Sequence, residues 1–349
     1  MNPKPLLYHF NNSPTAKLPT LSEVGGKALS LMKTFQAGFP VPTGFVLTSA
    51  FFEKWTKSKQ TRSEAQEQLL KEAMKQMKEE GIQLFSVRSS SPEEDLEGTS
   101  FAGMYETSLN VQLRSVKKAI VKSYLSCFDE RVAEYKKKQG FGKEAVMKPK
   151  IAVVVQEQIA SETAGVGFSL NPLNNCYDEA VIDANFGLGE NVVSGTKTPD
   201  SYIVDKVQGN ILEQKLGEKR KKAVLSEREL LEVGALIGKV EAFYGMPIDI
   251  EWAFAEGKLY LLQARPITAY FKVPEIMQTK PGEKKNAYVD VLIIKQGLVE
   301  PMSTLGMDAL NFVSTLVGAQ GMIDGSNVEF GYAYGGKMYT NMASFMKFL

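Results

Sequence analysis

Apolar residues recur along this chain with two spacings, and the change from one to the other marks its organisation. Apolar positions three or four residues apart predict amphipathic helices at 22–37, after Ser49, and at 63–80, 115–138 and 226–244. Short apolar or alternating runs predict strands at 151–159, 165–170, 180–185, 201–207, 249–255 and 258–265. Strands that follow one another closely favour an antiparallel meander over βαβ units, so the pattern predicts an α+β fold.

Length and composition narrow the classes of protein. A chain of 349 residues is too long for a single small hydrophobic core, so we expect two or three domains. The charges nearly cancel, with 41 basic and 40 acidic residues, so no bulk field favours nucleic acid or a membrane. No uncharged run approaches the length of about 20 residues that crosses a bilayer, and the N-terminal residues lack the apolar block of a signal peptide.

Cysteine and histidine are scarce. Two cysteines, Cys127 and Cys176, suit reduced thiols and a cytoplasmic protein better than a disulfide framework. The single histidine, His9, excludes a three-histidine zinc site, and its polar N-terminal surroundings favour a structural role.

One stretch places a cation at the end of a strand. Phe85 and Val87 predict a short strand that ends at Arg88, and three serines follow directly. An acidic loop and a turn of small residues come next. The planar guanidinium carries donors that match phosphate oxygens, so this arrangement suits a polyphosphate. A buried ion pair beside a surface loop explains Arg88 equally well.

Lys27 follows two glycines where a helix is expected to begin. Free amide groups and the dipole at a helix N-terminus favour an anion, and glycines allow close approach. The alternative is an ordinary helix cap with a solvated lysine.

The predicted hairpin 249–265 carries polar groups among core-type residues. Glu251 and Gln263 lie one on each arm, and burying such groups is costly unless something pairs with them. Two facing oxygen donors suit magnesium bound to phosphates, and Arg265 lies two residues after Gln263, on the same face. A buried salt bridge between Glu251 and Arg265 is the structural alternative.

These three stretches occur in order with three other motifs, and together they resemble one family. The motifs are VGGKALSL at Val24, FSVRSSSPEEDLEGTSFAG at Phe85, VVVQEQI at Val153, ANFGLGENVVSG at Ala184, PDSY at Pro199 and DIEWAF…LYLLQARPIT at Asp249. The chain resembles the ATP-binding domain of phosphoenolpyruvate synthase, pyruvate phosphate dikinase and rifampicin phosphotransferase over about residues 15–270.

The resemblance implies an ATP-grasp-like fold of two lobes, about 1–112 and 113–270, with a linker at 271–285 and the incomplete start of another domain at 286–349. It also implies ATP and Mg²⁺ as cofactors. Lys27, Arg88 and Arg265 would be catalytic and bind ATP phosphates. Gly103 and Thr107 would belong to a loop over the phosphates, Gln156 would lie beside the adenine, and Glu251 and Gln263 would hold the metal.

The family transfers phosphate from ATP to a histidine on a swivelling domain, in a dikinase-type reaction that ends on a small-molecule acceptor. No matching Thr/Cys-His motif occurs here, since His9 lies in a different context. We therefore expect the phosphohistidine domain on a longer polypeptide or a separate chain, and little turnover by this chain alone. An ATP-grasp carboxylate ligase and a non-catalytic nucleotide-sensing domain are the alternatives.

Overall fold

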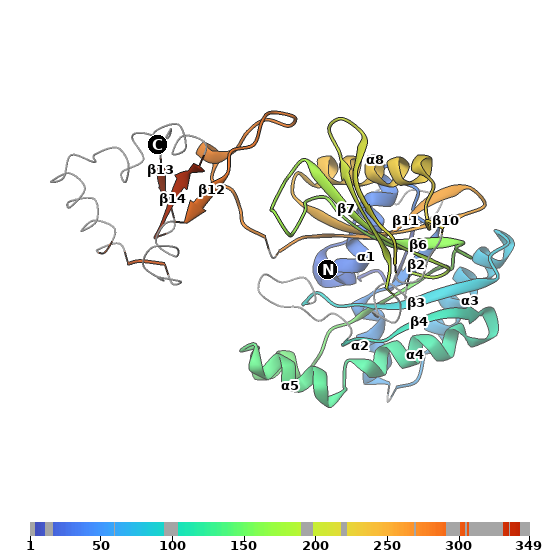
Figure 1. Ribbon diagram of the computed structural model, residues 1–349. Coiled ribbons are helices and arrows are strands. Elements are labelled where there is room, and N and C mark those ends of the chain that lie inside the picture. Colours follow the sequence, from blue (N-terminus) through green and yellow to red (C-terminus); the bar gives the residue numbers. More distant parts are fainter. Residues whose placement is uncertain are drawn as a thin grey trace. The chain divides into compact units, whose positions relative to one another are not determined.

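The computed structural model describes residues 4–10, 17–58, 60–93, 104–189, 198–217, 222–268, 270–290, 301–303, 306, 331–334 and 336–342. The chain forms two compact units, residues 1–270 and 271–349 (Figure 1). Among the described helices, none combines the length and the apolar character needed to cross a membrane.

The first sheet of unit 1 has the strand order β1-β2-β5-β3-β4 and is antiparallel throughout. Its strands are β1 (Leu7–Phe10), β2 (Gly44–Leu47), β3 (Leu84–Ser90), β4 (Thr107–Gln112) and β5 (Ala152–Glu157). The helices of this lobe are α1 (Leu21–Gln36), α2 (Ser49–Lys57), α3 (Glu64–Glu79), α4 (Val116–Ser126), α5 (Glu130–Lys138) and α6 (Lys143–Met147), with a 3₁₀ turn η1 (Leu113–Ser115) before α4.

Strand β5 alternates between two cores, because successive side chains of a strand point to opposite faces. Val153 and Val155 pack with α2, α3, α4 and α5, whereas Ala152 and Val154 pack with α1. The central place of β5 also moves the boundary between lobes. The chain leaves the first sheet after Glu157, rather than at the predicted residue 112, because β5 pairs with both β2 and β3.

The helix predicted over 115–138 is in fact two helices. Cys127 ends α4, and Asp129 caps α5 by accepting a hydrogen bond from the Arg131 amide at 2.9 Å. A residue with a capping carboxylate starts a new helix more favourably than it continues an old one. The prediction of one continuous helix was therefore wrong.

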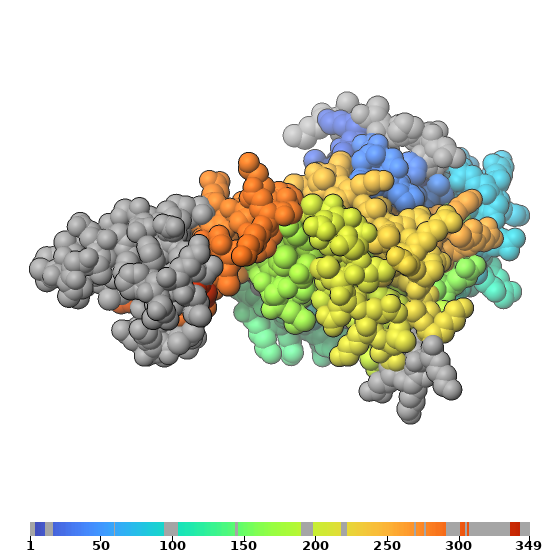
Figure 2. All heavy atoms as spheres, turned by 45° about the horizontal axis from the view of Figure 1, so that its top comes forward, coloured from blue at the N-terminus to red at the C-terminus, as the bar shows by residue number. Residues whose placement is uncertain are grey.

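The second sheet has the strand order β11-β10-β6-β7-β8-β9, and each neighbouring pair is antiparallel. Its strands are β6 (Thr163–Phe168), β7 (Glu179–Phe186), β8 (Asp200–Asp205), β9 (Asn210–Lys215), β10 (Ile248–Ala255) and β11 (Lys258–Pro266). The predicted meander and α+β class are confirmed. In the space-filling view, the yellow residues of the β8–β9 hairpin and α8 (Glu227–Tyr244) lie at the surface of unit 1 (Figure 2).

Helix α8 covers one face of this sheet. Val233, Ile237 and Val240 pack with Ile182 and Ile250 in the larger core. Residues of opposite parity on the strands, among them Asp183 and Glu251, therefore belong to the other face of the sheet.

Helix α1 connects the two sheets. It shares a core with both of them, and the Ser30 hydroxyl donates to the Ala264 carbonyl of β11. The Leu261 amide donates to the Pro40 carbonyl at 2.9 Å. The edge of the second sheet is thus fixed against the helix that lies on the first.

Unit 2 contains a small antiparallel sheet of β12 (Tyr288–Asp290), β14 (Lys337–Asn341) and β13 (Gly331–Tyr334), in that order. A short 3₁₀ turn, η2 (Glu275–Met277), precedes it. Of the strand predicted over 288–294, residues 288–290 are described, and most of the predicted helical run 304–317 lies outside the described residues.

Candidate functional site

The β10–β11 hairpin brings Glu251 and Gln263 directly opposite each other. Glu256 and Gly257 turn the chain with positive φ angles of 51° and 69°, which suits a tight hairpin. The next pair on the same face is Asp249 and Arg265, and the Arg265 Nε donates to both Asp249 carboxylate oxygens at 2.9 and 2.8 Å. One face of the hairpin therefore carries two neighbouring cross-strand pairs of polar side chains.

Arg88 joins this group from the other sheet. Its Nη1 donates to the Glu251 Oε2 at 3.2 Å, in an ion pair whose side chains are 13% and 31% exposed. This contact bridges β3 and β10, which are 163 residues apart in sequence. The Nε of Arg88 is buried and has no hydrogen-bond partner among the described residues. A buried donor without a partner costs free energy, so the site favours an added anionic acceptor.

The end of β3 is fixed against the start of α1. The helix has a non-helical residue, Gly25, with φ +76°, and a Cβ there would lie 2.5 Å from the Ser90 carbonyl carbon. The Ala28 amide donates to the Ser90 hydroxyl at 3.1 Å, and the Gly26 amide to the Ser91 carbonyl at 3.3 Å. The glycine thus gives close approach to β3 rather than directly to a ligand, and half-buried Lys27 lies between these two amides.

The other predicted ATP-binding residues occupy different positions. Thr107 is exposed and lies opposite Arg88 on β4, whereas Gly103 lies outside the described residues. Gln156 is buried, and its amide nitrogen donates to the Pro42 carbonyl at 3.0 Å. Gln158, in the connection between the sheets, has a buried Oε1 without a partner in the described part of the chain. Gln158 therefore offers an acceptor to a ligand.

A small apolar cluster lies beside Gln158. It consists of Ile159, Ala164 and Ala253, with Ala255, Tyr260 and Leu262 packed against it. Because this cluster lies along the same hairpin as Glu251, one elongated ligand can contact apolar and charged groups together. Of the predicted residues, the described contacts bring together Arg88, Glu251 and Gln263, with Arg265 in the next pair along the hairpin.

Two acidic residues of this face were not predicted from the sequence. Asp249 lies two residues before Glu251, and this spacing on a strand was a sufficient signal for a shared face. Asp183 lies across β6 from Glu251, since both pair with Val166. Burial raises the pKa of Asp183, although a hydrogen bond with Ser201 opposes the shift. Only the pairing of distant strands reveals this second residue.

The described residues fit a magnesium–polyphosphate ligand. Glu251 and Gln263 supply two facing oxygen donors, and Mg²⁺ commonly takes few protein ligands when phosphates complete its shell. Within the described ranges, no cluster of three or more His, Cys, Asp or Glu forms a metal cage. The donor set therefore suits a metal that arrives with a ligand better than one held by protein alone.

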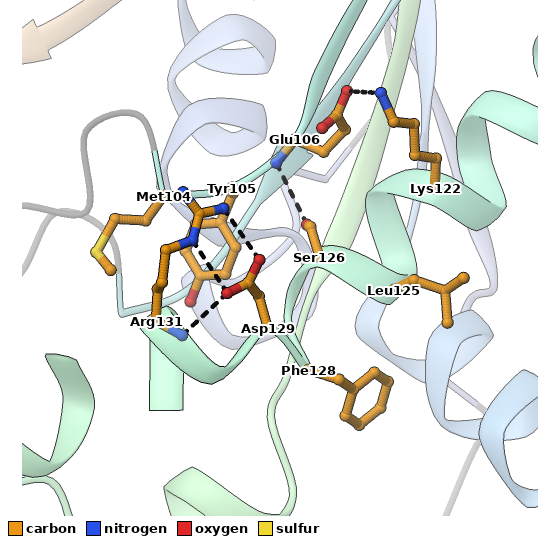
Figure 3. Close-up of a pocket in the computed structure, with 9 residues that line it drawn as sticks. All are labelled: Met104, Tyr105, Glu106, Lys122, Leu125, Ser126, Phe128, Asp129 and Arg131. Carbon is orange, nitrogen blue, oxygen red and sulfur yellow. Dashed lines mark hydrogen bonds and ion pairs between the residues drawn. The ribbon is translucent and has the colours of Figure 1, made fainter. Parts of the chain in front are cut away.

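A hollow of about 360 Å³ lies elsewhere on the first lobe (Figure 3). Its lining includes Leu125 and Phe128, and Figure 3 shows Arg131 paired with Asp129 and Lys122 paired with Glu106. Since its cations are already neutralised, this hollow is a poorer anion site than the Arg88–Glu251 group.

Comparison with known proteins gives one family match. Residues 62–285 match the profile described as "Pyruvate phosphate dikinase, AMP/ATP-binding domain". The matched range includes Arg88, Gln158 and the whole β10–β11 hairpin, and excludes Lys27.

Several curated proteins are similar over most of this chain. A "Probable phosphoenolpyruvate synthase" of Methanocaldococcus jannaschii is 34% identical over 78% of this chain and 27% of its own length. The "Uncharacterized phosphotransferase YvkC" of Bacillus subtilis is 35% identical over 76% and 35%, respectively. The "Prodigiosin synthesizing transferase PigC" of Serratia marcescens is 31% identical over 80% and 36%. The chain spans about a third of the length of these relatives.

Proposed function

The chain belongs to the pyruvate phosphate dikinase AMP/ATP-binding domain family, and from this premise we propose that it binds magnesium-ATP between its two sheets for phosphoryl transfer. The phosphoryl acceptor in this proposal is a histidine on a separate domain or chain, and a small molecule receives the phosphate afterwards. The reaction is that of a dikinase-type phosphotransferase.

One observation carries the proposal: the Arg88–Glu251 contact that joins β3 to β10. It brings a guanidinium with an unpartnered buried Nε beside a carboxylate that faces an amide. A cation for phosphate and oxygens for a metal thus meet at one point, as a magnesium–triphosphate complex requires.

Each residue has a role that follows from its chemistry. Arg88 and Arg265 donate to phosphate oxygens, and Lys27 approaches from α1. Glu251 and Gln263 hold the metal, which neutralises charge on the phosphates when it is bound. Positioning and charge neutralisation account for most of the rate in phosphoryl transfer, so no general base on this chain is needed.

The base of the nucleotide fits the remainder of the same face. The apolar cluster around Ala253 suits an adenine ring, and the Gln158 Oε1 can accept from its amino group. Thr107 and Gly103 then belong to the segment over the phosphates, and Gln156 supports the connection from behind through its contact with Pro42.

The lengths of the relatives are compatible with a separate acceptor domain. These relatives are about three to four times longer than the segment they share with this chain, so they have room for further domains. Names such as phosphoenolpyruvate synthase, phosphotransferase and prodigiosin synthesizing transferase describe those proteins. They are compatible with several final acceptors.

Calorimetric titration of MgATP into the folded chain tests the proposal directly. We expect saturable binding at one site, a loss of about a hundredfold or more in Arg88→Ala, and no change in the matched control Arg114→Ala, which removes an arginine of η1 outside the site. Absence of binding by the folded protein would refute the proposal. Among any products of slow turnover, AMP supports a dikinase-type reaction, whereas ADP alone indicates a carboxylate ligase.

A further inference from the structure

A lysine on α5 of the first lobe, outside the group around Arg88 and Glu251, is almost completely buried. The side chain of Lys136, on α5, is 1% exposed, and its Nζ forms an ion pair with the Glu93 carboxylate, which is 16% exposed. Glu93 follows the end of β3 by three residues. The pair therefore ties α5 to the segment that continues from Arg88.

Moving two charged groups from water into a protein core costs free energy of desolvation. An ion pair gives little net stability when both partners lose water, and an apolar pair of similar size often serves as well or better. A buried pair does, however, fix the direction of both side chains, and breaking it leaves one charge uncompensated. The Lys136–Glu93 pair is thus better explained by its effect on the orientation of the two side chains than by a contribution to the stability of the fold.

The segment 89–93 transmits that orientation to the candidate site. The Glu93 amide donates to the Ser91 hydroxyl at 3.3 Å, and the Ser91 carbonyl accepts from Gly26 at 3.3 Å. The adjacent Ser90 hydroxyl accepts from Ala28 at 3.1 Å. Three consecutive contacts therefore lead from Lys136 through Glu93 and Ser91 to Gly26 of α1, the residue before Lys27. The Ser90–Ala28 contact runs beside them, and β3 leads back from Ser90 to Arg88.

We propose that Lys136 is a positioning residue for the phosphate-binding end of β3. Through Glu93 it holds residues 89–93 against α1, and so fixes the relative positions of Arg88 and Lys27. The proposal rests on the proposed function for its effect on ATP, while the mechanical link from Lys136 to α1 can be measured without a ligand.

The test uses three variants in the full chain and one matched control. Lys136→Met removes the charge, Lys136→Arg keeps it, and the double variant Lys136→Met/Glu93→Met replaces the pair by apolar side chains. The control is Lys206→Met, because Lys206 is also a mostly buried lysine, 8% exposed, paired with Glu241 on α8.

Two readouts separate positioning from stability. For MgATP, Lys136→Met and the double variant should both lose about tenfold to a hundredfold in affinity, even though the double variant recovers the unfolding midpoint. Lys136→Arg should stay within about threefold of the wild type, because its charge can still pair with Glu93. Without ligand, amide hydrogen exchange in residues 22–30 should accelerate in both charge-removing variants and remain unchanged in Lys206→Met.

A double-mutant cycle adds a third criterion. In an Arg88→Ala background, Lys136→Met should cost little further affinity if it acts through Arg88. The proposal is overturned if Lys136→Met is destabilised but keeps the affinity and the hydrogen exchange of the wild type. It is also overturned if the double variant recovers full affinity. If the wild type does not bind MgATP at all, the proposed function fails, and the exchange measurement alone decides whether Lys136 positions this segment.

Discussion

Replacing Glu251 by glutamine should weaken the binding of MgATP and leave the binding of metal-free ATP unharmed. The amide keeps the shape of the side chain and an oxygen that faces Gln263, but it removes the negative charge 3.2 Å from Arg88. A carboxylate attracts the metal and repels the triphosphate. Its removal therefore lowers the affinity for MgATP without lowering the affinity for metal-free ATP.

The magnitude follows from the small number of protein donors. With Glu251 and Gln263 as the facing pair, loss of one charged ligand should cost about a hundredfold in affinity for MgATP, or ~2.7 kcal/mol. The free protein should lose only about 1–2 kcal/mol of stability, because the ion pair is neither fully exposed nor fully buried.

Titration calorimetry with excess magnesium and then with a chelator measures both affinities. In the chelator, Glu251→Gln should bind ATP as well as the wild type or better. Glu213→Gln, on the exposed strand β9, is the matched control and should change neither value. An equal loss with and without magnesium would refute the role of Glu251 as a metal ligand.

Three other changes test separate features. Gly25→Ala should lower the free energy of unfolding by about 3 kcal/mol or more, because its Cβ would lie 2.5 Å from backbone of β3; Gly38→Ala, at φ +82° with nothing within 4 Å, should lose only about 1–2 kcal/mol, and equal losses in denaturant titrations would exclude close packing as the cause. Burial raises the pKa of Asp183, so its ionised form destabilises the folded chain above that pKa; Asp183→Asn should raise the unfolding midpoint at about pH 7 and lose this advantage at about pH 3, and a pH-independent gain would contradict the sign. Gln158→Leu should weaken MgATP binding about tenfold without affecting magnesium tripolyphosphate, while equal losses for both would place Gln158 away from the base.

Features that depend on neighbouring residues could be predicted from the sequence. The capping boxes Ser63–Gln66 and Ser226–Glu229 begin α3 and α8 as expected, since each involves residues three positions apart. The hairpin turn at Glu256 likewise sets the pairing of β10 and β11 from Ala255–Lys258 to Trp252–Leu261. A register shift between Glu251 and Trp252 then brings Glu251 opposite Gln263, and the turn chemistry alone does not predict that shift.

Features that join distant segments could not be predicted in this way. No pattern of spacing places β5 between β2 and β3, and none pairs Arg88 with Glu251. The sequence alternative of a Glu251–Arg265 pair was plausible, yet each of these residues has a different partner in the structure, Arg88 and Asp249 respectively. Same-face alternation limits the candidates, but the packing of the two sheets selects among them.

The late arrival of β5 has a consequence for folding during synthesis. Until residue 157 has left the ribosome, β1–β2 and β3–β4 are two separate ribbons with unpaired edges, because β5 is the one described strand that hydrogen-bonds to both. Such edges readily pair with other chains. The nascent protein is therefore most prone to aggregation between the emergence of β4 and that of β5, and a truncated product ending at residue 112 would remain permanently in that condition.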